Sequence, residues 1–211
     1  REARGFIIKK EGYKYVLVCV PFTKFFCVGD PNAQDALYKL AHRDEWYVEE
    51  KIDGSLIKLW WDNNEWHIST SGTTDAEKAA VQFEMNNIAN YRQLFMYASK
   101  DKIDYSKLNQ HYTYMFELVS PENKVVCAYN TPTIYYLGRR NIKTLKEVSY
   151  FEDDCLGLEK CKRPRCTVIY PKTSPKKAMA ELKHKVDSLT TSDENFEGVV
   201  ISDEGLKSRI K

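Results

Sequence analysis

Short apolar and aromatic stretches, separated by turn residues, fill the first third of the chain. They predict antiparallel strands at residues 5–8, 15–20, 46–50, 56–61 and 66–69. Asp53-Gly54 lies between the third and fourth stretches and Asp62–Asn64 between the fourth and fifth. Because these residue types favour tight hairpin turns, we expect a meander in which each strand pairs with the next.

The pattern then becomes helical. Apolar side chains between Thr74 and Ser99 fit one face of a long helix, for which Thr74 or Asp75 provides an N-cap. Further elements are predicted on the same grounds, with strands at residues 112–119, 124–128 and 133–137 and a helix at residues 174–189. A strand-like segment at residues 197–201 and a basic end close the chain.

These elements predict an α+β fold of mostly antiparallel sheets with flanking helices. No internal repeat or low-complexity linker interrupts residues 1–211, so we expect a single domain. The chain stops in a strand-like segment, which leads us to expect a piece of a longer protein.

Composition and charge set wide limits. The 32 Lys and Arg residues nearly balance the 30 Asp and Glu residues, for a net charge of +2, so any surface that binds nucleic acid must be a local one. The chain has no apolar run of about 18 residues, and its opening residues lack the apolar core of a signal peptide. We expect an intracellular, cytoplasmic protein without contact to a membrane.

The six cysteines include no Cys-x-x-Cys pair. Cys155, Cys161 and Cys166 lie close together in the sequence, but their spacing matches no common zinc motif, and free thiols are the better expectation. The basic run at residues 160–165 lies in the same stretch. It fits a contact with RNA phosphates and a solvated loop equally well.

Four short motifs carry the candidate chemistry, and their order matters more than any one of them. The segment Lys51–Ser55 taken alone reads as a hairpin turn with a solvated lysine. It is followed, however, by Phe116–Asn123, then by Phe196–Val200, and finally by Arg209–Lys211. This ordered series is a more specific signal than any single motif within it.

The series resembles the covalent nucleotidyltransferase superfamily of ATP-dependent ligases and capping enzymes. The superfamily's collinear motifs are Lys-x-Asp-Gly, a strand ending in an acidic residue, Glu-Gly-x-Val and Lys-x-Lys. Within it, the chain looks most like phage-type RNA ligases that repair broken tRNA, on the basis of Ala3–Gly5, Pro21–Phe26 and Phe116–Val126. The resemblance implies one ATP-grasp-like nucleotidyltransferase domain over residues 1–211, with a nucleotide cleft, belonging to a longer ligase.

The resemblance further implies that Lys51 is the nucleophile. Its amine would take AMP from ATP, form a lysyl-adenylate and pass AMP to an RNA 5′-phosphate, and a 3′-hydroxyl would then displace AMP to seal the strand. The amine must be deprotonated to attack. The departing pyrophosphate calls for fixed cations and a divalent metal, Mg²⁺ or Mn²⁺.

Other site residues carry over from the family motif by motif. Glu117 matches the residue that holds ribose, and Glu197 matches the residue that holds the metal. The expected nucleotide contacts are Arg4, Lys24, Phe26, Glu50, Ile52, Asp53, Gly54, Glu117, Arg209 and Lys211. Phe26 offers a stacking face for adenine, while the residues leave open whether Tyr135 or Tyr136 faces the base.

Two positions depart from the family pattern. The family usually has a basic residue in a short segment after the lysine, where this chain has Ser71, and serine cannot supply the charge. The last motif normally reads Lys-x-Lys, whereas here Arg209 takes its first position and Lys207 lies two residues earlier, so the register is open. Arginine keeps the positive charge.

Alternative functions share parts of this pattern. A GTP-dependent capping-type guanylyltransferase uses the same lysine chemistry, but the Lys24–Phe26 segment favours RNA ligase, as the motif spellings do over DNA ligase. A non-catalytic RNA-end-binding domain would explain Ser71, yet Lys51, Glu117, Glu197 and Lys211 are all retained. The partners implied are RNA with 5′-phosphate and 3′-hydroxyl ends, such as broken tRNA, and a fused or separate end-healing kinase and phosphatase. In a viral or phage protein, the host cytoplasm would be the location.

Overall fold

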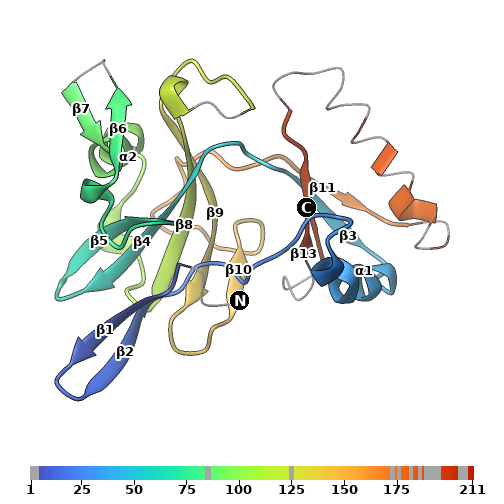
Figure 1. Cartoon of the computed structure of the whole chain (residues 1–211), viewed down its shortest axis with the longest axis horizontal. Helices are drawn as coiled ribbons and strands as arrows, with labels where there is room; N and C mark the ends of the chain where they lie inside the picture. The colour runs from blue at the N-terminus through green and yellow to red at the C-terminus, as the bar shows by residue number, and fades with distance from the viewer. Residues whose placement is uncertain are drawn as a thin grey trace. The chain divides into compact units, whose positions relative to one another are not determined.

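The structure is a computed structural model that describes residues 5–83, 87–123, 126–171, 174, 177–180, 183–184, 187, 196–203 and 209–211. The chain divides into two compact units, which are described separately (Figure 1). The first comprises Arg1–Thr23 and Gly54–Arg163, and the second comprises Lys24–Asp53 and Pro164–Lys211. Antiparallel sheets with few helices confirm the predicted α+β class.

The first unit is built on a five-stranded antiparallel sheet (Figure 1). Its strands run in the order β10-β9-β8-β4-β5, with bounds Glu147–Ser149, Thr133–Asn141, Tyr112–Val119, Ser55–Asp62 and Glu65–Thr70. Asn63 and Asn64 both have positive φ, 49° and 61°, as the tight turn of a two-residue hairpin requires. The predicted hairpin between β4 and β5 is therefore confirmed.

One face of this sheet is covered by helix α2 (Tyr91–Ser99). Its Phe95 ring lies 5.4 Å from the ring of Phe116 on β8, and both side chains are fully buried. The Asn90 side chain accepts a hydrogen bond from the Gln93 amide at 2.9 Å. Asn90 thereby begins the helix as an N-cap.

The prediction of one long helix from Thr74 to Ser99 is wrong for its first two thirds. The 3-10 turn η2 (Ala76–Lys78) and the strands β6 (Ala80–Phe83) and β7 (Ile88–Asn90) precede α2. Asn87 adopts a positive φ of 53°, a conformation that a helix cannot contain but that asparagine tolerates in a turn. The apolar positions therefore serve two short strands and a short helix.

The other face carries the hairpin of β1 (Ile7–Glu11) and β2 (Lys14–Cys19) beside a buried lysine. Lys58 is 1% exposed and donates a hydrogen bond from Nζ to the Gly5 carbonyl at 2.7 Å. Burial lowers the pKa of Lys58 and raises the pKa of the Cys19 thiol to about 11. Both shifts follow from the cost of placing charge in an apolar interior.

The second unit has a four-stranded sheet in the order β11-β3-β12-β13. Its strands span Cys166–Ile169, Trp46–Glu50, Val199–Ser202 and Arg209–Ile210. Helix α1 (Gln34–Ala41), which the sequence analysis did not predict, follows the turn η1 (Pro31–Ala33) and packs its Leu40 with Trp46 and Ile210 into an apolar core. The Trp46 indole donates to the Leu40 carbonyl at 2.9 Å, which satisfies a group at the helix end.

Strand β3 contradicts the predicted meander. It pairs with β11 and β12, whereas β4 pairs with β5 and β8. Asp53-Gly54 therefore joins two different sheets and is not a hairpin turn. The predicted strand at residues 124–128 is also wrong where the structure describes it, because residues 126–128 form no strand.

The remaining elements are short. Two further 3-10 turns, η4 and η5, span Tyr105–Lys107 and Pro121–Asn123. Of the predicted helix at residues 174–189, residues 177–180, 183–184 and 187 are helical, and most of the others lie outside the described residues. Within the described part of the chain, no helix has the length and apolar character needed to cross a membrane.

Gly138 on β9 provides a test of the sheet. Its φ is +135°, and a Cβ atom there would lie 2.5 Å from the Val148 carbonyl oxygen. We expect Gly138→Ala to lower the free energy of unfolding by about 1–3 kcal/mol, because it adds backbone strain and a contact with rigid main chain. Urea unfolding followed by circular dichroism measures the change.

The matched control is Gly72→Ala, since a Cβ atom at Gly72 meets nothing within 4 Å. Its unfolding midpoint should stay close to that of the unsubstituted chain. Equal midpoints for the two variants would contradict the assignment of strain to Gly138.

Candidate active site

Lys51 is the first residue after strand β3, and backbone pairing brings it to the Glu-Gly motif. Its amide donates to the Gly198 carbonyl at 2.9 Å, which extends the pairing of Glu50 with Val199. The Lys51 Nζ contacts Glu197 Oε1 as hydrogen bond and ion pair, with the two side chains 27% and 22% exposed. Two motifs that are far apart in the sequence therefore form one ion pair open to solvent.

The other carboxylate oxygen of Glu197 has the character of a cation ligand. Glu197 Oε2 is buried and has no hydrogen-bond partner among the described residues. No group of three His, Cys, Asp or Glu side chains suited to a metal occurs in the described ranges. Mg²⁺ is commonly held by one or two carboxylates with phosphate oxygens and water, so Glu197 fits that kind of site.

The C-terminal residues are fixed by pairing with the segment that follows Lys24. Phe26 and Ile210 form a parallel bridge. The Lys211 amide donates to the Phe26 carbonyl at 2.9 Å, and the Val28 amide donates to the Lys211 carbonyl at 2.7 Å. Lys211 therefore has a defined backbone position although it is the last residue.

Both cations of the last motif face an aromatic ring that the sequence analysis did not single out. The Arg209 guanidinium lies 5.1 Å and the Lys211 Nζ lies 5.9 Å from the centre of the Phe25 ring. Such cation–π contacts hold charged groups in place. The signal that could have found Phe25 is its place between Lys24 and Phe26, both of which were expected in the site.

Lys24 and Phe26 form their own pair. The Lys24 Nζ lies 4.8 Å from the centre of the Phe26 ring, and Phe26 is half-buried against the apolar core of the second unit. The role of Phe26 as a stacking face for adenine stays a prediction. Arg4 and Lys207 lie outside the described residues.

A cavity in the second unit brings three of the predicted residues together. It has a volume of about 810 Å³, and Lys51, Glu197 and Lys211 line it together with Cys27. Apolar side chains of helix α1 form another part of its wall, among them Leu37 and Ala41. Amines and a carboxylate beside apolar groups suit a ligand with a charged part and a flat apolar part.

The residues on either side of Lys51 lie in different surroundings. The Glu50 carboxylate accepts from Arg165 Nε at 2.8 Å, so it is engaged by a cation. Ile52 and Asp53 are buried, at 8% and 4% exposure. Asp53 is therefore a buried residue of the loop that follows Lys51.

In the first unit, Gly54 lies tightly against strand β8. A Cβ atom at Gly54 would lie 2.5 Å from the Leu118 carbonyl oxygen, so only glycine fits there. Asn123 of the Pro-Glu-Asn turn donates to Ser55 Oγ at 2.9 Å and accepts from Tyr91 Oη at 3.1 Å. The second motif of the series is therefore linked to the end of the first by close packing and hydrogen bonds.

Strand register decides which tyrosine shares a face with Glu117. Glu117 pairs with Tyr135, and Phe116 pairs with Tyr136, and directly opposed residues point to the same side of a sheet. Tyr136 is fully buried, with its ring 5.5 Å from that of Phe116. Tyr135, which is half-buried, is thus the tyrosine on the Glu117 face.

The segment that departs from the family pattern forms a closed turn. The Thr70 hydroxyl accepts from the amides of Gly72 and Thr73, at 3.2 Å and 3.1 Å. Ser71 is exposed at its tip. The turn thus presents a neutral residue where the family carries a charge.

Solved structures with a similar fold include RNA ligases. An archaeal ATP-dependent RNA ligase matches with a TM-score of 0.65 at 16% identity, over 98% of this chain and 51% of that one. A Naegleria gruberi RNA ligase variant solved with ATP and Mn matches with a TM-score of 0.56 at 11% identity, over 90% of this chain and 54% of that one. These likenesses show that the chain has a fold that also occurs in RNA ligases.

The sequence comparisons identify the family. The RNA ligase family matches residues 2–210, and the chain belongs to this family. A putative bifunctional polynucleotide kinase/RNA ligase of Autographa californica nuclear polyhedrosis virus is 32% identical over 92% of this chain and 28% of its own length. An RNA ligase of Rhodothermus phage RM378 is 30% identical over 71% of this chain and 39% of its own length. The chain therefore spans less than half of either relative.

Thiol reactivity tests the burial pattern around the site. All six cysteines are free, Cys27 is exposed at the cavity, and Cys19 and Cys161 are buried. Burial raises the pKa of both buried thiols to about 11, so at pH 8 only about one thousandth of each is the reactive thiolate. We expect iodoacetamide to label Cys27 first, as mapped by peptide mass spectrometry.

Labelling in 6 M guanidinium, where burial is lost, serves as the control and should reach all six thiols. Modification of Cys19 or Cys161 in the folded chain at the rate of Cys27 would contradict the burial pattern.

Proposed function

We propose that the chain is the nucleotidyltransferase part of an ATP-dependent RNA ligase that works through a covalent lysyl-adenylate on Lys51. The observation that carries the proposal is the single cavity lined by Lys51, Glu197 and Lys211. Three motifs of the family series converge there in a chain that belongs to the RNA ligase family. A capping-type guanylyltransferase would bring the same motifs together, so the cavity alone does not separate it from an RNA ligase. Membership of the RNA ligase family favours the ligase.

In the proposed first step, Lys51 Nζ forms a bond to the α-phosphorus of ATP as the bond to pyrophosphate breaks. The amine needs its lone pair, so a proton must leave Nζ. Glu197 Oε1 is the acceptor in contact with that nitrogen, which also aims the amine toward the cavity. Positioning of this kind accounts for a large part of rate enhancement in phosphoryl transfer.

The charges around the cavity suit a triphosphate. Lys211 lines it, and Arg209 shares the Phe25 ring with Lys211, so two cations are available to the departing pyrophosphate. Glu197, with its buried Oε2, would hold Mg²⁺ or Mn²⁺. When bound, such an ion supplies positive charge to the phosphates.

The first unit carries a residue that the family resemblance assigns to the nucleoside. Glu117 is assigned to the ribose by family resemblance, and Tyr135 is its direct neighbour on the same face of the sheet. We assign the base-facing role to Tyr135. Tyr136 is engaged on the opposite face instead, where its hydroxyl donates to Asp153.

In the later steps, AMP would pass to an RNA 5′-phosphate, and an RNA 3′-hydroxyl would displace it to seal the strand. RNA repair, including that of broken tRNA, is the setting this chemistry suits. One relative is named as a fused polynucleotide kinase and RNA ligase, which supports a fused or separate end-healing partner. An intracellular location, in a host cell for a phage or viral protein, accords with such a substrate.

The decisive experiment incubates the purified chain with Mg²⁺ and α-labelled ATP, or separately with α-labelled GTP, before denaturing electrophoresis. We expect covalent label from ATP that falls to background in Lys51→Ala, because alanine has no nucleophile. Lys143→Ala, which removes an exposed lysine of the first unit, should label like the unsubstituted chain.

Label from GTP alone would make the chain a capping-type enzyme. The absence of label from either nucleotide would favour a non-catalytic RNA-end-binding domain.

Two tyrosine variants test the assignment of the base-facing residue. Tyr135→Ala should raise the ATP KM of adenylylation about 2- to 10-fold, because an aromatic stack contributes about 0.5–1.5 kcal/mol, and should leave stability nearly unchanged. Tyr136→Phe should keep the KM and lower the free energy of unfolding by about 1–3 kcal/mol, since it leaves a buried acceptor unpaired. The reverse pattern in kinetics and urea unfolding would assign the base to Tyr136.

A further inference from the structure

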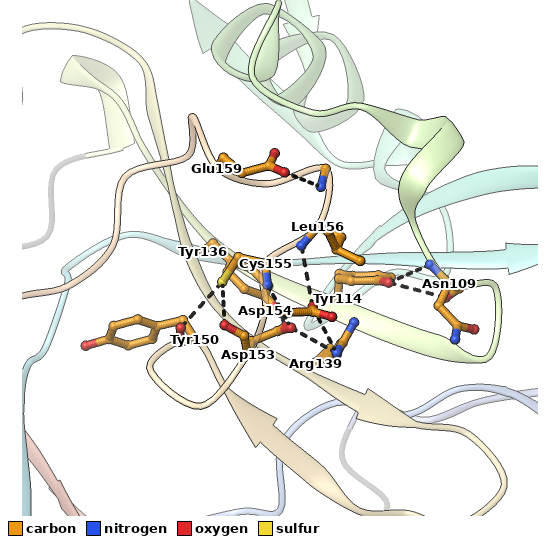
Figure 2. A network of polar contacts seen from close by, with 11 residues as sticks. Asn109, Tyr114, Tyr136, Arg139, Tyr150, Asp153, Asp154, Cys155, Leu156 and Glu159 are labelled. Atoms are coloured by element: carbon orange, nitrogen blue, oxygen red, sulfur yellow. Dashed lines mark hydrogen bonds and ion pairs between the residues drawn. The ribbon is translucent and has the colours of Figure 1, made fainter.

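A buried network in the first unit fixes the loop that carries the basic run (Figure 2). The Asp153 side chain is fully buried and lies 2.9 Å from Arg139 Nη2, and Tyr136 Oη donates to the same carboxylate. The Cys155 amide donates to Asp153 Oδ1 at 3.0 Å. Burial raises the pKa of Tyr136 far above its ordinary value, so this hydroxyl remains a donor at any physiological pH.

The loop that follows is held along its length. The amides of Leu158 and Cys161 donate to the carbonyls of Cys155 and Leu158 at 2.8 Å and 3.0 Å. The Tyr136 amide donates to the Lys162 carbonyl at 2.8 Å, so the loop joins strand β9. Cys155, Leu158 and Cys161 are buried and anchor the loop from within.

This anchoring leaves three cations exposed in a fixed arrangement. Lys160, Lys162 and Arg163 are exposed, and within the described residues none of them forms an ion pair with an acidic side chain. The Lys162 Nζ lies 5.9 Å from the centre of the Tyr135 ring. Lys162 is bridged to Tyr135, and Tyr135 pairs with Glu117 on the next strand. The basic run therefore lies next to Tyr135 along strand β9.

A neighbouring loop, in which Lys102 stands between Asp101 and Asp104, packs against the basic loop. Cys161 Sγ donates to the Lys102 carbonyl at 3.6 Å, and the Asp104 amide donates to the Gly157 carbonyl at 2.9 Å. Lys102 and Arg163 both act electrostatically on the Cys161 thiol. Glu159, the acidic residue within the basic loop, accepts from the Gly157 amide instead.

Three unpaired cations on a rigid loop repel one another unless an anion lies across them. RNA presents phosphates at regular spacing, and phosphate contacts from lysine and arginine position a nucleic acid without reading its sequence. We propose that Lys160, Lys162 and Arg163 form a binding surface for the phosphate backbone of the RNA substrate, separate from the groups that transfer AMP. This inference rests on the proposed function, which makes RNA the substrate.

The test compares two triple variants that remove the same charge. Lys160→Ala/Lys162→Ala/Arg163→Ala removes the proposed surface. Lys10→Ala/Lys14→Ala/Lys143→Ala removes three other exposed lysines of the first unit. Binding of a fluorescent, 5′-phosphorylated single-stranded RNA is measured by anisotropy across about 50–200 mM KCl. Lysyl-AMP formation is measured without RNA.

For the first variant we expect the Kd for RNA to rise about tenfold or more, and the slope of log Kd against log salt to fall by about 2, because each phosphate contact on a single strand contributes about 0.7. At saturating ATP, adenylylation without RNA should keep the rate of the unsubstituted chain; only its ATP KM is open to change, because Lys162 contacts the Tyr135 ring. The control variant should keep most of the affinity and slope. Equal losses in both variants, or none in either, would overturn the proposal.

Other outcomes separate this inference from the proposed function. Loss of RNA binding in the first variant, in a chain that never labels with ATP, would sustain the surface and overturn the ligase mechanism. ATP labelling with unchanged RNA affinity would do the reverse. If poly-glutamate bound the unsubstituted chain as tightly as RNA did, an acidic protein would replace RNA as the partner.

Discussion

The pairing of β3 with β12 is the constraint on which the rest of the candidate site depends. It sets Lys51 beside Gly198 through one backbone hydrogen bond and so brings the Lys51 amine to Glu197. A slip of one residue in this register would turn the Lys51 side chain to the other face of the sheet. The remaining site residues of the second unit, Lys211 included, are placed by strands of the same sheet or by segments bonded to it.

The α+β fold class could be predicted from the sequence, while the roles assigned to the site residues stay predictions. Residue chemistry and motif order predicted Lys51, Glu197 and Lys211, which the second unit brings to one cavity. Strands whose pattern is strong, such as Trp46–Glu50 and Tyr112–Val119, were predicted to the residue. The site residues could be predicted because a reaction restricts which residue types can serve at each position. The strands could be predicted because alternation of apolar and polar residues is a local pattern.

The pairing of strands that are far apart in the sequence could not be predicted from local patterns. Asp53-Gly54 has the composition of a hairpin turn, but composition does not say which strand a residue's neighbour will pair with. Tyr135 and Tyr136 could be told apart only through the register with Glu117, which passes an irregularity between Met115 and Phe116. The hairpin prediction was wrong and the choice between the two tyrosines was left open for one reason: both depend on tertiary contacts, which override local preference.

Two of the ion pairs, Arg139–Asp153 and Lys51–Glu197, differ in their burial. Asp153 is sealed from water and holds both Arg139 and Tyr136, so breaking it would leave a buried charge unpaired, and its geometry is kept. Lys51 and Glu197 remain about a quarter exposed, so water, a cation or a phosphate can compete for either partner. The proposed nucleophile would have to exchange its contacts during a reaction, whereas the loop of the proposed RNA surface would have to retain its own. The difference in burial between the two ion pairs suits these two proposed roles.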